Sequence, residues 1–281
     1  MNNYFCGWYF KCQSKGCSIA FIPAFHIYNG EKTYSLQFIC SAGSYTVPIK
    51  DKNFCADKTR SSVSWQHNRL DEKGIELNVD EDGFSAKGQL YFGEPSKISG
   101  DIMGPFKYVP FMECRHSVFS MRHSVNGKIT VCGKEYVFED GVGYIEGDRG
   151  YSFPKRYAWT QCLCENGSVM LSVADIPLGP ISFTGLIGIV QTGGRQYRLA
   201  TYLGAKAVKI EKGEIEIRQG KLRLSVRFKD GGLHSLSAPK DGQMSRMIKE
   251  NIRCDARYVF SENDRVILDV SSSEASLEYE Y

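Results

Sequence analysis

The chain has 281 residues, of which 42% are hydrophobic, 12% aromatic and 24% charged, and its formal net charge is +3. This composition excludes a disordered protein, and so small a charge, without long lysine or arginine runs, argues against nucleic acid as a partner. The length suits either one large β domain or two domains of ordinary size.

The first residues, MNNYFCGWYF, contain no basic segment followed by an apolar one, as a secretory signal would. No run approaches the roughly 18 apolar residues of a membrane-spanning helix. The chain has 10 cysteines but no Cys-x-x-Cys pair, which favours reduced structural thiols over disulfides or a zinc site. We therefore expect a cytoplasmic protein without a transmembrane segment, which leaves peripheral contact with a membrane open.

Alternation of apolar and polar residues with period two recurs along the chain and predicts an all-β fold. The pattern predicts three hairpins, with strands over 75–79 and 84–92 (turn Asp82-Gly83), 118–125 and 129–131 (turn Asn126-Gly127), and 215–217 and 222–228 (turn Gln219-Gly220). Further turns are predicted at Gly193-Gly194-Arg195 and at residues 230–232.

Residues 240–252 place Met244, Met247, Ile248 and Asn251 at helix-like spacing, and this short segment predicts one helical turn or a loop. Many short strands with glycine-rich turns indicate a sandwich or a barrel, and we favour barrels because closure removes exposed strand edges. The glycine-rich stretch over 141–150 is the best place for a domain boundary.

Polar and aromatic residues concentrate between Asp101 and Gln161. On a strand over 112–123 the even-numbered residues would share one face and the odd-numbered residues the other, which separates Cys114, His116, Val118 and Arg122 from Glu113, Arg115, Phe119 and His123. Two interpretations of these residues stay open. Glu113 and Arg115 form either a solvated ion pair or part of a cavity with a buried acid, and His116 is either structural or catalytic.

Glu146 and Asp148 are two residues apart, so a strand would point both carboxylates to one face. Paired carboxylates repel unless one is protonated or a cation lies beside them. In an apolar cavity one of them could act as a general acid, whereas in solvent neither would have a role. Aromatic residues such as Trp8, Tyr144 and Trp159 either fill a core or stabilise a cation.

Four blocks of residues follow one another along nearly the whole chain. They are Gly7-Trp8-Tyr9-Phe10-Lys11; Ile102-Met103-Gly104-Pro105-Phe106 with Val109-Pro110-Phe111-Met112-Glu113-Cys114; Gly143-Tyr144-Ile145-Glu146 with Asp148, Gly150, Ser152-Phe153-Pro154, Trp159 and Gln161; and Leu236, Ala238-Pro239, Gly242 and Met244 with Leu268-Asp269, Ala275 and Leu277-Glu278. In these blocks the sequence resembles the tocopherol cyclase family, as seen in its bacterial members.

The resemblance implies two lipocalin-like antiparallel β-barrel domains packed together, a fold related to that of carotenoid hydratases and of some lipocalin-like pericyclases. The order of the blocks favours an N-terminal barrel over 1–142 and a C-terminal barrel over 143–281.

The resemblance also implies an intramolecular cyclase. A protein acid protonates the double bond of a hydrophobic prenylated quinol, a tertiary carbocation develops, and the phenolic oxygen captures it without any cofactor or metal. Asp148 or Glu146 would be the acid. The implied substrate contacts are Trp8 and Trp159 at the cation, Gln161 with His116 at the hydroxyl, and Glu113, Tyr144 and Phe153.

Three positions depart from the family pattern, since Gly147 replaces a lysine, Arg149 a tryptophan and Cys6 an acidic residue. Because of these departures the identity of the substrate stays open, and a polyene is one alternative to the prenylated quinol. The alternative function is a non-catalytic lipocalin-like binder or carrier of an apolar small molecule, and a structural or interaction role is a third.

Overall fold

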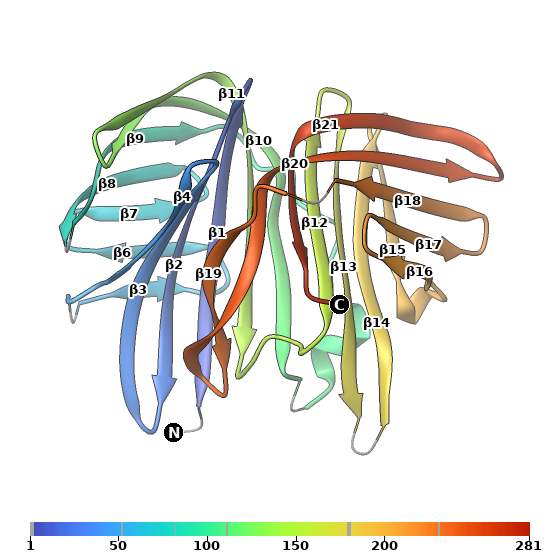
Figure 1. Cartoon of the computed structure of the whole chain (residues 1–281), viewed down its shortest axis with the longest axis horizontal. Helices are drawn as coiled ribbons and strands as arrows, with labels where there is room; N and C mark the ends of the chain where they lie inside the picture. The colour runs from blue at the N-terminus through green and yellow to red at the C-terminus, as the bar shows by residue number, and fades with distance from the viewer. Residues whose placement is uncertain (1–2, 52, 82, 111, 179–180, 230) are drawn as a thin grey trace. The chain divides into compact units, whose positions relative to one another are not determined.

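The computed structural model describes residues 3–51, 53–81, 83–110, 112–178, 181–229 and 231–281. It is all-β and contains two large antiparallel sheets, as Figure 1 shows. The helical elements of the described residues are two short 3-10 turns, η1 (Gly104–Tyr108) and η2 (Thr201–Leu203). No helix in this part of the chain is long and apolar enough to cross a bilayer.

The first sheet has 11 strands in the order β4-β3-β2-β1-β11-β10-β9-β8-β7-β6-β5. In chain order these are β1 (Tyr4–Ser14), β2 (Cys17–Tyr28), β3 (Glu31–Cys40), β4 (Gly43–Pro48), β5 (Cys55–Asp57), β6 (Ser62–Trp65), β7 (Asn68–Asp71), β8 (Gly74–Glu81), β9 (Phe84–Phe92), β10 (Cys114–Val131) and β11 (Lys134–Gly150).

The second sheet has 10 strands in the order β15-β14-β13-β12-β21-β20-β18-β17-β16, with β19 paired to β20. Its strands are β12 (Tyr157–Cys164), β13 (Gly167–Leu178), β14 (Ile181–Thr192), β15 (Arg195–Ala200), β16 (Lys206–Glu211), β17 (Glu214–Gln219), β18 (Leu222–Phe228), β19 (His234–Lys240), β20 (Gln243–Glu262) and β21 (Arg265–Tyr279).

Each sheet curls around its own hydrophobic core. Phe38 on β3 and Phe84 on β9 have ring centroids 6.0 Å apart, although five strand spacings separate their strands, roughly 24 Å in a flat sheet. In Figure 1 strands β6 to β9 accordingly cross β1 to β3. Tyr197 on β15 and Phe260 on β20 meet at 4.9 Å in the second sheet in the same way.

The pairings of the described strands do not close either sheet. The first sheet ends at β4 and β5, and the second ends at β15 and β16. The all-β prediction is therefore confirmed, whereas closure into barrels is not.

The chain packs into two compact units that are interleaved along the sequence. Unit 1 comprises Met1–Ile98, Met112–Phe153 and Leu236–Met247, and unit 2 comprises Ser99–Phe111, Pro154–Ser235 and Ile248–Tyr281. The predicted boundary between residues 142 and 143 stays a prediction; both residues lie within β11.

A short excursion of the chain belongs to unit 2 and carries the Ile102–Phe106 block. The guanidinium of Arg198 donates hydrogen bonds to the backbone carbonyls of Ser99 and Asp101. Gly104 has φ +52°, and a Cβ there would lie 2.3 Å from the ring of Tyr202. Glycine is therefore required where the excursion meets Tyr202. Phe111, at the end of this segment, lies outside the described residues.

Three of the predicted turns lie between strands as expected. Gly83 connects β8 to β9, Gly193-Gly194 connects β14 to β15, and Gly220 lies between β17 and β18. Asp82 and Asp230, which the sequence also places in turns, lie outside the described residues.

The predicted turn at Asn126-Gly127 is wrong, because β10 continues through both residues to Val131. Gly127 has φ +120° and lies at a register shift, and a Cβ there would be 2.4 Å from the carbonyl oxygen of Gln89 on β9. The dipeptide thus forms a bulge, which needs a positive φ just as a turn does.

The helical turn or loop predicted over 240–252 is also wrong, because most of this segment belongs to β20. Ile248, Glu250, Ile252 and Cys254 are buried in period two. The buried Glu250 is the residue that hides this alternation, since a sequence pattern reads a glutamate as exposed.

Candidate functional site

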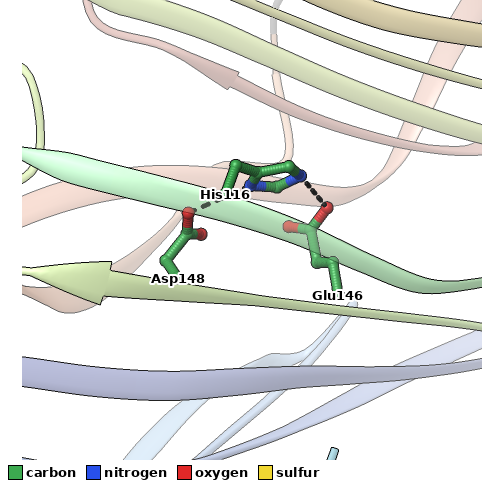
Figure 2. Close-up of side chains that lie close together, drawn as sticks. All are labelled: His116, Glu146 and Asp148. Atoms are coloured by element: carbon green, nitrogen blue, oxygen red, sulfur yellow. Dashed lines mark hydrogen bonds and ion pairs between the residues drawn. The ribbon is translucent and has the colours of Figure 1, made fainter. Parts of the chain in front are cut away.

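The two carboxylates singled out in the sequence meet one histidine on the first sheet. The register places His116 on β10 directly opposite Asp148 on β11, with Glu146 on the diagonal two residues away. Directly opposed and diagonal residues share a face in an antiparallel pair, so their side chains meet. Figure 2 shows the imidazole ring lying between the two carboxylates. The prediction that Glu146 and Asp148 share one face is confirmed.

Each ring nitrogen of His116 faces a different carboxylate. Nδ1 lies 3.0 Å from Oδ1 of Asp148 in a hydrogen bond, and Nε2 lies 3.1 Å from Oε2 of Glu146 (Figure 2). The second contact is one of charge, because Nε2 lacks a well-aligned hydrogen-bond acceptor. The side chains of His116 and Glu146 are only 9% and 7% exposed.

These surroundings hold a proton on His116. Burial by itself lowers the pKa of the imidazole, but the attraction of Glu146 and Asp148, together with the hydrogen bond to Asp148, outweighs burial and raises the pKa well above its ordinary range. The imidazolium supplies the cation that two neighbouring carboxylates need, and it keeps a proton inside the protein at neutral pH.

Two further donors fix the carboxylates. The hydroxyl of Tyr144 donates to Oε2 of Glu146 at 2.6 Å, and the thiol of Cys114 donates to Oδ1 of Asp148 at 3.3 Å. Burial, followed by the nearby carboxylates, raises the pKa of both groups well above the usual range, so both keep their protons. We call His116, Glu146, Asp148, Tyr144 and Cys114 the proton cluster.

One carboxylate oxygen of the proton cluster is left for another molecule. In the described part of the chain, Oδ2 of Asp148 makes no hydrogen bond or ion pair, and the Asp148 side chain is 21% exposed, more than His116 or Glu146. Asp148 is therefore the more accessible of the two carboxylates.

Trp8 lies on the opposite face of the sheet from the proton cluster. It pairs with Gly147, whereas Gly7 pairs with Asp148, so Trp8 points to the other side. Trp8 is 1% exposed and belongs to the core of unit 1, 6.3 Å from the ring of Phe25.

The three departures from the family pattern gather on that same core-side face. Cys6 is directly opposite Arg149 across β1 and β11, and Gly147 is the next residue of β11 on this face. A Cβ at Gly147 would lie 3.3 Å from Trp8 and 3.1 Å from Phe119. The departures therefore change the surroundings of Trp8 and leave the proton cluster intact.

Glu113 and Phe153 lie beside the end of the two central strands. The backbone carbonyl of Glu113 accepts hydrogen bonds from the amides of Tyr151 and Ser152. Burial, and then the neighbouring Asp241, raises the pKa of the Glu113 carboxyl. The ring of Phe153 packs edge-on against Phe5 with centroids 5.5 Å apart. Both residues are half-buried.

Trp159 and Gln161 lie on β12 in unit 2. Trp159 is opposite Ser172 and Glu278, and Gln161 is opposite Met170 and Ser276. Their side chains are 5% and 0% exposed. Both belong to a different unit from the proton cluster.

Sequence analysis missed two members of this region. Period two places Cys114 on the face of His116 but gives it no role, and only the register of β10 with β11 brings it to Asp148. His123 was assigned to the opposite face, but β10 has register shifts between Val118 and Ser120 and between Ser120 and His123. These shifts bury His123 and bring its Nδ1 within 2.9 Å of Oγ of Ser120.

His116, Glu146 and Asp148 also have the side chains of a divalent-cation site, because one ligand atom from each lies within 4.8 Å of the others. The ring presents a different nitrogen to each carboxylate, at 3.0 Å from Asp148 and 3.1 Å from Glu146, distances at which the imidazolium itself contacts both acids. The arrangement fits a bridging imidazolium.

The comparisons with solved structures show proteins of the same fold. The structure of CghA matches with a TM-score of 0.66 at 9% sequence identity, covering 99% of this chain and 88% of CghA. CghA with Sch210972 matches with a TM-score of 0.64 at 8% identity over 99% and 88% of the two chains. Kievitone hydratase from Nectria haematococca matches with 0.55 at 8% identity over 99% and 89%.

The sequence comparisons identify the family of the chain. No curated protein sequence matches the chain significantly. Residues 65–279 match the model of the family described as tocopherol cyclase-like, and this range includes β10, β11 and the whole proton cluster. The match covers most of the chain and agrees with the resemblance in the four sequence blocks, so the chain belongs to the tocopherol cyclase-like family.

Proposed function

We propose that this protein is an intramolecular cyclase that closes a ring in a hydrophobic prenylated quinol or polyene by acid catalysis. The observation that carries the proposal is the buried His116, held protonated between Glu146 and Asp148. Membership of the tocopherol cyclase-like family supports it, as does the similarity of fold to a hydratase.

In the proposed reaction His116 stores the proton and Asp148 delivers it. A proton moves from Nδ1 of His116 along the 3.0 Å hydrogen bond to Asp148, which makes a carboxylic acid and a neutral imidazole. The acid then protonates the substrate double bond, so that a C–H bond forms and a tertiary carbocation remains. The substrate hydroxyl oxygen attacks this cation, a C–O bond forms, and the hydroxyl proton returns to the cluster. The product is an isomer of the substrate.

The remaining assignments complete the proposal. Tyr144 and Cys114 hold the two carboxylates in place, and Glu146 keeps the imidazolium charged when no substrate is bound. Glu113 and Phe153 are proposed substrate contacts in unit 1, whereas the substrate contacts predicted for Trp159 and Gln161 of unit 2 stay predictions from the sequence. Trp8 lies on the core-side face, within a lipocalin-like, incompletely closed barrel, and takes no part in the proton transfer proposed for Asp148. No cofactor takes part in these steps.

The test is to incubate purified protein with prenylated hydroquinones of different tail length in D2O. The wild type should form a ring-closed isomer that carries one deuterium on the carbon that was protonated. Asp148→Asn should lower the rate by about 10²- to 10⁴-fold, the usual contribution of a general acid. Glu135→Gln is the matched control, because Glu135 lies on the same strand with a 54% exposed side chain.

Two results would overturn the proposal. Either the wild type forms no cyclised product from any of these substrates, or Asp148→Asn forms it as fast as Glu135→Gln. In the first case, native mass spectrometry of a complex with unchanged quinol would support the alternative function of a carrier.

A further inference from the structure

Directly paired residues form a continuous row across five strands of the first sheet. The register pairs Tyr34 on β3 with Phe25 on β2, Phe25 with Cys6 on β1, Cys6 with Arg149 on β11, and Arg149 with Arg115 on β10. Opposed residues of antiparallel strands point to one face with Cβ atoms about 4.5–5.5 Å apart. Two aromatic rings, a thiol and two arginines therefore lie side by side, on the face opposite the proton cluster.

Two lysines add positive charge at the aromatic end of this row. Nζ of Lys32 lies 4.5 Å from the ring centroid of Phe25 and 5.2 Å from that of Tyr34. Nζ of Lys58 lies 4.6 Å from the ring of Tyr4 and contacts its hydroxyl at 3.1 Å. Aromatic faces attract these cations but do not neutralise their charge.

The row has no negative charge of its own to balance these cations. In the described part of the chain, Arg149, Lys32 and Lys58 form no ion pair with a carboxylate, and Arg149 donates instead to Oγ of Ser117 at 3.2 Å. Cys6 is 3% exposed, and burial raises the pKa of its thiol to about 12 in spite of Lys58 and Arg149, so it stays neutral.

Apolar surface continues from the row into unit 1. Cys6 and Phe25 are core residues, and the next residue of β1 on this face is Trp8. Tyr4 and Tyr34 are half-buried and pack against the same core, whereas Lys32 and Lys58 are exposed. The row thus lies where the core of unit 1 meets solvent, with the exposed lysines outermost.

We propose that the row Tyr34–Phe25–Cys6–Arg149–Arg115 binds an amphipathic anion, that is, a carboxylate or phosphate head group on an apolar chain. Arg149 and Lys58 would bind the head group through charge-assisted hydrogen bonds, and the aromatic rings would cover the first carbons of the chain. The site is independent of the proposed proton transfer, because it lies on the opposite face and uses none of the proton cluster.

The proposal is tested by isothermal titration calorimetry with dodecanoate, dodecyl phosphate and 1-dodecanol, all below their aggregation concentrations. At least one of the two anions should bind at least tenfold more tightly than the alcohol, and higher ionic strength should weaken that binding. The anion that binds better identifies the head group. Arg149→Gln should weaken anion binding by about tenfold, in line with one lost charge-assisted hydrogen bond.

Lys58→Met and Lys134→Met separate the proposed site from general electrostatics. Lys134 also lies over an aromatic ring, 5.0 Å from the centroid of Tyr136, but it is outside the row. Lys58→Met should weaken anion binding and Lys134→Met should not. The proposal is overturned if neither anion binds, if dodecanol binds as tightly, or if Arg149→Gln and Lys58→Met both retain wild-type affinity. Since Lys58 is exposed, its variant stays informative if Arg149→Gln does not fold.

Discussion

His116, His26 and His123 are all buried, yet their surroundings shift their pKa values in opposite directions. Burial lowers the pKa of His26 to about 4 and that of His123 to about 3. At His116 the two carboxylates more than compensate for burial and raise the pKa. One chain therefore contains an imidazolium and two neutral imidazoles over the same range of pH.

This contrast predicts distinct NMR titrations of the imidazole rings. Ring nitrogen resonances should show His116 protonated at pH 7.5, and His26 and His123 neutral at pH 5. Because its folded pKa is raised, the protonation of His116 stabilises the fold fully below the unfolded value of about 6.5, and this stabilisation is lost as pH rises through the folded pKa. Glu146→Gln should lower the pKa of His116. A wild-type His116 that titrates near 6.5 would contradict the charge pairing.

The carboxylate pair was predictable from sequence, but its surroundings were not. Glu146 and Asp148 share a face because they lie two apart on one strand, which is a local property. The position of Trp8 relative to that face depends on the register of β1 with β11, and no local pattern determines a register between strands so far apart in sequence. The position of His116 depends on the register shifts within the hairpin of β10 and β11, which no local pattern determines either.

At the scale of elements, the irregular stretch of β10 is matched to a glycine on β11. The ring of His123 covers Gly143, and a Cβ on Gly143 would lie 2.2 Å from Nε2 of the ring. On the ring's other side, Phe92 lies 4.4 Å from it, centroid to centroid. The ring therefore has little room to move away.

Gly143→Ala should consequently destabilise the protein by about 1–3 kcal/mol, as overpacking in a core does. A double-mutant cycle with His123→Ala, measured by chemical denaturation, should show that the alanine at 143 costs little once the ring is gone. Equal costs in both backgrounds would show that the strain lies elsewhere. Gly43→Ala serves as a control, since a Cβ there meets nothing within 4 Å.

The strands themselves were largely predictable, because burial alternates along most of them. One exception is a pair of residues that fits two structures. Asn126-Gly127 suits a turn or a bulge, since both accept a positive φ, and β9 on its other side decides between them. The curling of the sheets was expected, but whether their ends join depends on contacts between β4 and β5, which no local pattern contains.

At the scale of the whole molecule, several hydrogen bonds hold the late segment Leu236–Met247 on unit 1, and the side chain of Gln37 makes two of them. The amide of Gln37 donates to the carbonyl of Ser237 at 2.9 Å and accepts from its N–H at 2.8 Å. Gln37 is 3% exposed, so water does not replace these bonds easily. In unit 2, Gln219 makes the same kind of paired contact with the carbonyl of Arg198 and the amide of Ala200.

Gln37→Ala should therefore destabilise the protein by about 1–3 kcal/mol, the usual cost of leaving buried hydrogen-bonding groups without partners. Hydrogen–deuterium exchange should show faster exchange confined to residues 236–247. Gln219→Ala is the matched control and should accelerate exchange around residues 198–200 instead. If both variants accelerate the same segments, the two glutamines do not act locally.

The interleaving of the units also has a consequence during synthesis. Unit 1 contains residues up to Met247, so its last strand segment leaves the ribosome long after Phe153. At roughly 5–20 residues per second, the intervening stretch takes about 5–20 s to translate. Throughout this delay the two hydrogen bonds between the Gln37 side chain and the backbone of Ser237 cannot form. The order of translation thus makes unit 1, although it begins first, dependent on chain that is made after most of unit 2.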